Sequence, residues 1–176
     1  TQYSEDGGIM EILKRNIEVV FPLLHGSYGE DGVLQKKLEE RKIAFVGSSS
    51  RVSSVTINKK KTNEILYDEG LLIPKSSIVT RERYWHECSY PLIVKPVDQG
   101  SSLGLFKFMS EKEYQGSLEK IFNNREQMLV QEFVEGREFT CGVIEKHNEV
   151  IPFVATEVIV TKGEMFDYDA KYTADG

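Results

Sequence analysis

The sequence contains only two cysteines, Cys88 and Cys141, and neither lies in a Cys-x-x-Cys pair or a Cys/His metal-ligand spacing. Neither a disulfide framework nor a zinc site is therefore indicated. No apolar run approaches the roughly 20 residues of a membrane-spanning helix, and the polar, acidic start is unlike a secretory signal. We therefore expect a cytoplasmic protein with free thiols.

Positive charge is also in deficit, because 22 lysines and arginines face 28 aspartates and glutamates, for a net charge of −6. The field of the whole chain therefore repels nucleic acid and anionic membranes, and any polyanion has to be bound locally. A chain of 176 residues with 40% hydrophobic residues can build a packed core. Since no methionine opens the chain, we expect it to be part of a longer protein.

The first third of the sequence predicts an α/β unit. The apolar run Ile17–Leu24 predicts a buried parallel strand, and Asp31 is a candidate cap for a helix over residues 32–41. A second short strand is expected over Ile43–Val46. The serine-rich segment Gly47–Ser54 then breaks the pattern, and it is a candidate domain junction.

The rest of the chain predicts an α+β unit with mainly antiparallel strands. A helix over Asn58–Glu69 should end at Gly70, and Ser110 with Glu113 forms a capping box for a second helix. Strands are expected at residues 73–79, 92–94, 103–108, 128–134, 137–145 and 149–154, with a tight turn at His147 and Asn148 joining the last two.

The loop Gln99–Gly104, with the sequence QGSSLG, offers backbone N–H groups and two hydroxyls to a phosphate. A P-loop or a Rossmann turn needs a helix after the glycines, whereas here the strand-like LGLFKF follows. The loop is therefore expected to fold over a ligand as a flap between two strands. An ordinary serine-glycine hairpin is the alternative.

Two lysines and one glutamate stand at positions that suggest ligand binding. Lys95 ends an apolar strand beside the flap, and Lys59 opens a helix, where the helix dipole disfavours a cation. Glu138 begins a strand after Gly136, where its carboxylate can accept hydrogen bonds from ribose hydroxyls. Each residue has an alternative interpretation without a ligand. Lys95 could extend to solvent, Lys59 could belong to a solvated basic run at Lys59–Lys61, and Glu138 could be a surface residue.

The order of these parts is more specific than any one of them. HGSYGEDG, LIVKP, QGSSLG, LVQEFVEGRE and FDYDAKY follow one another between His25 and Tyr172. This order resembles the D-alanine–D-alanine ligase family of ATP-grasp enzymes. The resemblance implies α/β plus α+β architecture, with part of an N-terminal domain at residues 1–47, a central ATP-grasp domain at 48–134, and the start of the C-terminal domain at 135–176.

The resemblance also implies an activity. One D-alanine carboxylate attacks the γ-phosphate of ATP, and the amine of a second D-alanine captures the acyl phosphate, in peptidoglycan precursor synthesis. ATP, Mg²⁺ or Mn²⁺, D-alanine and a homodimer are implied, with no nucleic-acid or membrane partner. A D-alanine–D-serine or D-lactate ligase of the same fold and a non-catalytic ATP-binding module stay open, although Tyr172 argues against the D-lactate class.

Site residues follow from the resemblance as well. It implies ATP contacts at Lys59, Lys95, Gly100, Ser101, Ser102, Gln131, Glu132, Phe133, Val134, Glu138 and Lys171, and substrate contacts at His25, Glu30, Ser101 and Tyr172. Ser101, Lys171 and Tyr172 are the catalytic candidates. Gln131 replaces the family's usual glutamate, and its amide oxygen can still accept from an adenine amino group. The metal ligands are expected beyond Gly176.

Overall fold

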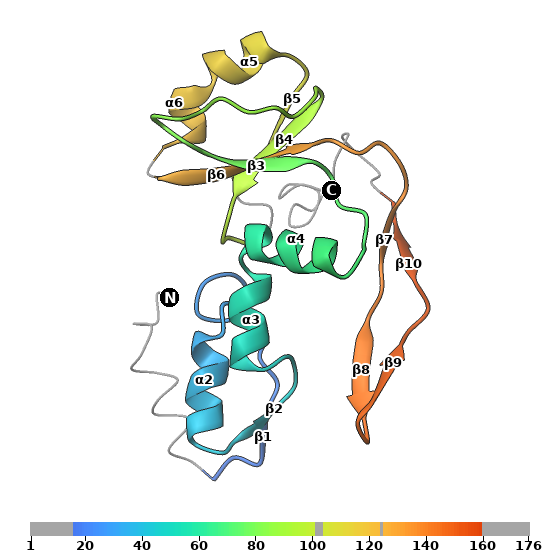
Figure 1. The fold of residues 1–176 in the computed structure, drawn as a ribbon. Helices are drawn as coiled ribbons and strands as arrows, with labels where there is room; N and C mark the ends of the chain where they lie inside the picture. Colours follow the sequence, from blue (N-terminus) through green and yellow to red (C-terminus); the bar gives the residue numbers. More distant parts are fainter. Residues whose placement is uncertain (1–15, 101–103, 124, 160–176) are drawn as a thin grey trace.

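The computed structural model describes residues 16–100, 104–123 and 125–159, and it shows a mixed α/β fold (Figure 1). The N-terminal unit pairs β1 (Val19–Val20) in parallel with β2 (Ala44–Phe45), and α2 (Val33–Glu40) connects them. Leu34 and Leu38 of α2 form its small core. The predicted strand, helix and strand of this unit are thus present.

The apolar run Ile17–Leu24 is not the buried strand that its composition predicted. Only two of its residues are in β1, and Val19, Phe21 and Leu23 are 60%, 66% and 76% exposed. Among the described residues β1 pairs with β2 alone. A strand in a parallel sheet becomes buried only when neighbouring strands and helices cover it.

Two helices follow the N-terminal sheet. The serine-rich segment does not simply interrupt the fold, because Ser49 caps α3 (Ser50–Thr56) by accepting a hydrogen bond from the Val52 N–H. The next helix, α4 (Lys59–Asp68), is capped by Asn58 and is followed by Gly70 at a φ of 80°. Local capping signals therefore predicted α4 well.

The central unit is a four-stranded antiparallel sheet in the order β3 (Ser76–Thr80), β6 (Gln127–Glu132), β4 (Leu92–Pro96) and β5 (Phe106–Phe108). The helices α5 (Glu111–Gly116) and α6 (Leu118–Ile121) cover one face, as Figure 1 shows. The core there comprises Val79, Cys88, Leu92, Val94, Phe108, Tyr114, Ile121, Phe122, Met128 and Val130. Ser110 caps α5 as predicted, while the Glu113 carboxylate accepts from the Met109 N–H instead of the Ser110 N–H.

Strand alternation gives the other face of this sheet a different composition. The register places Lys95 opposite Leu129 and Ile93 opposite both Gln131 and Lys107, so these five residues share one face. Helix α4 lies on this side (Figure 1), and residues of α4, β3 and β6 line a cavity of about 260 Å³. We call this surface the α4 face.

The last described segment is a long two-stranded ribbon. It consists of β7 (Glu138–Thr140) paired with β10 (Thr156–Val158), and of β8 (Val143–Lys146) paired with β9 (Glu149–Pro152). The expected single strand 137–145 is interrupted at Gly142, where a Cβ would lie 2.9 Å from the Phe153 ring, and β10 was not predicted. The turn at His147 and Asn148 is confirmed by their positive φ angles. No helix in the described ranges is long and apolar enough to span a membrane.

Replacing Gly32 by alanine should destabilise the N-terminal unit. An added Cβ would lie 2.4 Å from the Ser50 carbonyl oxygen, and the φ of 91° disfavours L side chains. We expect the free energy of unfolding to fall by at least about 2 kcal/mol in chemical denaturation.

The matched control is Gly116→Ala in α5, where no described atom lies within 4 Å of the added Cβ. This change should be neutral or slightly stabilising, because alanine favours helix. Equal unfolding midpoints for the two variants would contradict the close approach of α2 and α3.

Candidate functional site

Two lysines from different elements meet at the α4 face. Lys59, the first residue of α4, donates its ammonium to the Gln99 carbonyl oxygen, and its backbone N–H donates to the Val97 carbonyl oxygen at 2.8 Å. Lys95 of β4 donates its ammonium to Gln131 Oε1 at 2.8 Å. The start of the helix is thus fixed to the end of the strand, and both ammonium groups lie at the base of the flap.

The charges of these lysines are incompletely compensated. Burial lowers the pKa of both ammonium groups, and the positive charge of Lys95 lowers the pKa of Lys59 further, while Asp98 opposes this effect. Within the part of the chain that the structure describes, the hydrogen-bond acceptors of the two ammonium groups are a backbone carbonyl and a side-chain amide, which are neutral. An anion bound between them would offset both their desolvation and their mutual repulsion.

The flap connects the antiparallel strands β4 and β5, as predicted. Gly100 lies beside the N-terminal loop, because an added Cβ would be 2.9 Å from Glu30 Oε2 and 3.9 Å from the Gly26 Cα. The structure therefore brings Gly100 and Glu30 together, although they are far apart in sequence. Ser101 and Ser102 lie outside the described residues.

The N-terminal loop is organised by its two carboxylates. Glu30 accepts from the Gly26 N–H and lies 3.8 Å from His25 Nδ1. Asp31 accepts from the backbone N–H groups of Tyr28 and Val33. The N-cap of α2 is Gly32, so Asp31 is not the N-cap residue that the sequence predicted but binds the first helical N–H from one position earlier.

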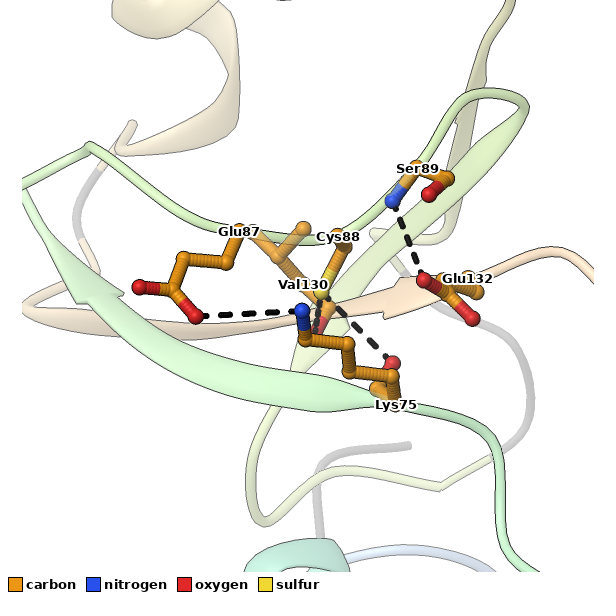
Figure 2. A network of polar contacts seen from close by, with 6 residues as sticks. All are labelled: Lys75, Glu87, Cys88, Ser89, Val130 and Glu132. Carbon is orange, nitrogen blue, oxygen red and sulfur yellow. Dashed lines mark hydrogen bonds and ion pairs between the residues drawn. The ribbon is translucent and has the colours of Figure 1, made fainter.

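The residues at the end of β6 point in different directions, because neighbouring side chains of a strand alternate. Gln131 faces Lys95. The Glu132 carboxylate lies on the other face of the strand and accepts from the Ser89 N–H at 3.1 Å, a hydrogen bond drawn in Figure 2. The Phe133 N–H donates to the Pro91 carbonyl oxygen at 2.9 Å, and Val134 is exposed. Glu138 is exposed at the start of β7.

Lys107 is a candidate that sequence reasoning missed. Its ammonium lies 4.2 Å from the centre of the Phe133 ring, on the same face as Lys95. The sequence offered a signal for it, because side chains alternate along a strand. In the sequence FKF of β5, Lys107 stands between two phenylalanines that face the core, so its side chain is expected on the opposite face.

The network in Figure 2 has a structural role. The buried Cys88 thiol donates towards the carbonyl oxygens of Lys75 and Val130 at 3.6 and 3.8 Å, and Lys75 lies 3.7 Å from the Glu87 carboxylate. Burial raises the pKa of the Cys88 thiol, which disfavours the reactive thiolate. These contacts attach the segment before β4 to the sheet.

A metal-binding cluster was expected only beyond Gly176. Across the described ranges no group of three or more His, Cys, Asp or Glu side chains could hold a metal ion. Lys171 and Tyr172, two of the catalytic candidates, lie outside the part of the chain that the structure describes.

Comparisons with known proteins agree over nearly the whole chain. Residues 2–48 match the family model described as D-ala D-ala ligase N-terminus, and residues 70–176 match D-ala D-ala ligase C-terminus. The D-alanine–D-alanine ligase of Syntrophotalea carbinolica is 34% identical over 93% of this chain and 52% of its own length. D-alanine–D-alanine ligase A of Escherichia coli K12 is 35% identical over 89% of this chain and 44% of its own.

Solved structures are similar too. The VanG D-Ala:D-Ser ligase of Enterococcus faecalis superimposes with a TM-score of 0.74 and 32% identity, over 89% of this chain and 47% of that one. The D-alanine–D-alanine ligase of Helicobacter pylori gives a TM-score of 0.70 and 28% identity, over 79% and 44%. The chain thus spans about half the length of the relatives that it matches.

The repulsion between the two lysines can be measured directly. In Lys95→Met the pKa of the Lys59 ammonium should rise towards its ordinary value, because the neighbouring positive charge is removed while the side-chain volume is kept. Lysine ¹³Cε chemical shifts followed through an alkaline titration give this pKa.

The control is Lys60→Met, which removes an exposed lysine that lies 3.8 Å from Glu64. It should leave the titration of Lys59 unchanged. If Lys95→Met also leaves it unchanged, the two ammonium groups do not interact.

Proposed function

Because this chain belongs to the D-alanine–D-alanine ligase family, we propose that the protein containing it joins two D-alanines with ATP, through an acyl phosphate, for peptidoglycan precursor synthesis. The observation that carries the proposal is the pair of half-buried cations, Lys59 and Lys95, at the base of a glycine-rich flap. Such a pair suits the phosphates of a nucleotide, because phosphoryl transfer needs its negative charge neutralised and its groups positioned.

The nucleotide would lie along the α4 face. Lys59 and Lys95 would bind its phosphates, together with the flap residues Gly100, Ser101 and Ser102. The purine would continue past Gln131 towards the backbone of 132–134, and Glu138 would accept from the ribose. The partly exposed ring of Phe133 and the exposed Val134 support this direction, since they line the strand end beyond Gln131.

The D-alanine that is phosphorylated would bind near the N-terminal loop. Glu30 lies beside Gly100, so His25 and Glu30 are next to the flap whose glycine and serine groups would orient the substrate. Ser101, Lys171 and Tyr172 are proposed to complete the site, with the segment around Lys171 closing over the phosphates. Exclusion of water would protect the acyl phosphate from hydrolysis.

Magnesium or manganese would bridge the ATP phosphates and supply additional positive charge. The described residues offer no carboxylate cluster for it, so the ligands are proposed to lie outside this part of the chain. We propose the same domain division as above, 1–47, 48–134 and 135–176, within a cytoplasmic homodimer.

A D-alanine–D-serine ligase is the second candidate, because the VanG D-Ala:D-Ser ligase superimposes on this chain with a TM-score of 0.74. The deciding experiment supplies the whole protein with ATP and with D-alanine as the substrate that is phosphorylated. The acceptor is D-alanine, D-serine or D-lactate in separate reactions. ADP release and the dipeptide or depsipeptide formed are measured together. Release of ADP that depends on D-alanine, with D-alanyl-D-alanine as the main product, supports the proposal, whereas nucleotide binding without any product indicates a non-catalytic module.

Lys95→Met should weaken ATP binding by the whole protein about tenfold or more, because a charge-assisted contact to phosphate is lost. Methionine keeps the length and apolar character of the side chain, so the unfolding midpoint should change little. Calorimetric titration with Mg-ATP measures the effect.

Lys112→Met is the matched control, since Lys112 is exposed on α5, on the opposite side of the sheet. Its ATP affinity should equal that of the wild type. Wild-type affinity in Lys95→Met as well would remove Lys95 from the phosphate site.

A further inference from the structure

Lys95 orients the amide of Gln131. The two residues are diagonal neighbours on the α4 face, because Lys95 pairs with Leu129 and Gln131 lies two residues further along β6. A lysine ammonium has donors only, so it selects the amide oxygen, and Lys95 Nζ lies 2.8 Å from Gln131 Oε1. The amide nitrogen of Gln131 therefore points away from Lys95.

The two N–H donors of that nitrogen remain available. Within residues 16–100, 104–123 and 125–159, the hydrogen bond of the Gln131 side chain is the one that Oε1 accepts from Lys95, and Nε2 donates none. Gln131 is half-buried, and the ring of Phe133 lies just beyond it on the same strand end. A planar ligand that extends from the lysine pair along the α4 face would thus meet a donor at this position.

A glutamate at the same position would present the opposite chemistry. One carboxylate oxygen would pair with Lys95, and the second would be an acceptor, because an ionised carboxylate has no donor. The distinction matters for purines, since the 6-amino group of adenine is a donor and the 6-oxo group of hypoxanthine or guanine is an acceptor.

We propose that Gln131 lets this site accept 6-oxo purine nucleoside triphosphates, such as ITP, alongside ATP. The proposal rests on the proposed nucleotide-binding function, and it assigns Gln131 as a residue that sets base selectivity. Its amide oxygen is held by Lys95, and its Nε2 would donate to the 6-oxo group of such a base. With ATP bound, the amide oxygen has a second lone pair that can accept from the 6-amino group.

The experiment compares nucleotide affinities of the whole protein with Gln131→Glu. Dissociation constants for Mg-ATP and Mg-ITP are measured by calorimetry at neutral pH. The ratio of the ITP constant to the ATP constant should be at least about fivefold higher in Gln131→Glu than in the wild type, because a carboxylate would face the 6-oxo group. A ratio taken within one variant cancels any partial loss of fold.

Two further variants separate donor chemistry from general disturbance. Gln131→Met has neither donor nor acceptor, so its ratio should lie between those of the wild type and Gln131→Glu. Gln127→Glu makes the same chemical change at an exposed position of the same strand, and its ratio should equal that of the wild type.

The inference fails if wild type and Gln131→Glu share one ratio while both bind ATP, and the proposed function then stands. It also fails if the wild type binds neither nucleotide, but in that case the proposed function fails with it. A ratio that rises equally in Gln127→Glu would attribute the effect to added negative charge and would likewise overturn the assignment of Gln131.

Discussion

The antiparallel pairing of β4 with β6 is the constraint on which the candidate site depends. Their register buries Leu92, Val94 and Val130 against α5 and α6, so the alternate residues must emerge on the opposite face. Lys95 and Gln131 are two of those alternate residues. A slip of one residue in this pairing would move the lysine into the core and the apolar residues to the α4 face, which the hydrophobic effect opposes.

Two lysines held near each other in a partly buried place cost free energy, because each loses hydration and each repels the other. The fold tolerates the cost by giving each ammonium a fixed acceptor, the Gln99 carbonyl for Lys59 and the Gln131 amide for Lys95. Both partners are neutral, so positive charge is retained at the surface of the α4 face. A site arranged in this way favours a polyanion in a protein whose net charge is −6.

The approach of the N-terminal loop to the flap connects the α/β unit to the central sheet. Glu30 reaches this position because its carboxylate is fixed by the Gly26 N–H within the same loop, and Gly100 has no side chain to obstruct it. The candidate substrate residues and the candidate phosphate residues therefore meet at one place, although two separate elements carry them. This proximity is consistent with the proposed ligase function, in which an amino-acid carboxylate has to approach a nucleotide phosphate.

Local signals in the sequence determined most of the helices and turns. Asn58 and Gly70 delimited α4, Ser110 began α5, and the apolar residues after the glycine loop predicted that this loop joins two strands. Such features depend on backbone groups within a few residues, so a single sequence contains the required information. The order of the motifs along the chain also identified the family.

Tertiary structure alone decided which of these residues meet. No local pattern places Lys59 beside Lys95 or Glu30 beside Gly100, because long-range packing brings those elements together. The exposure of Ile17–Leu24 was misjudged for the same reason, since an apolar run is buried only where other elements cover it. The orientation of the Gln131 amide likewise depends on Lys95 across the strand pair. An amide group can be turned so that either its oxygen or its nitrogen faces a neighbour, and a lysine ammonium, which donates but does not accept, selects the oxygen.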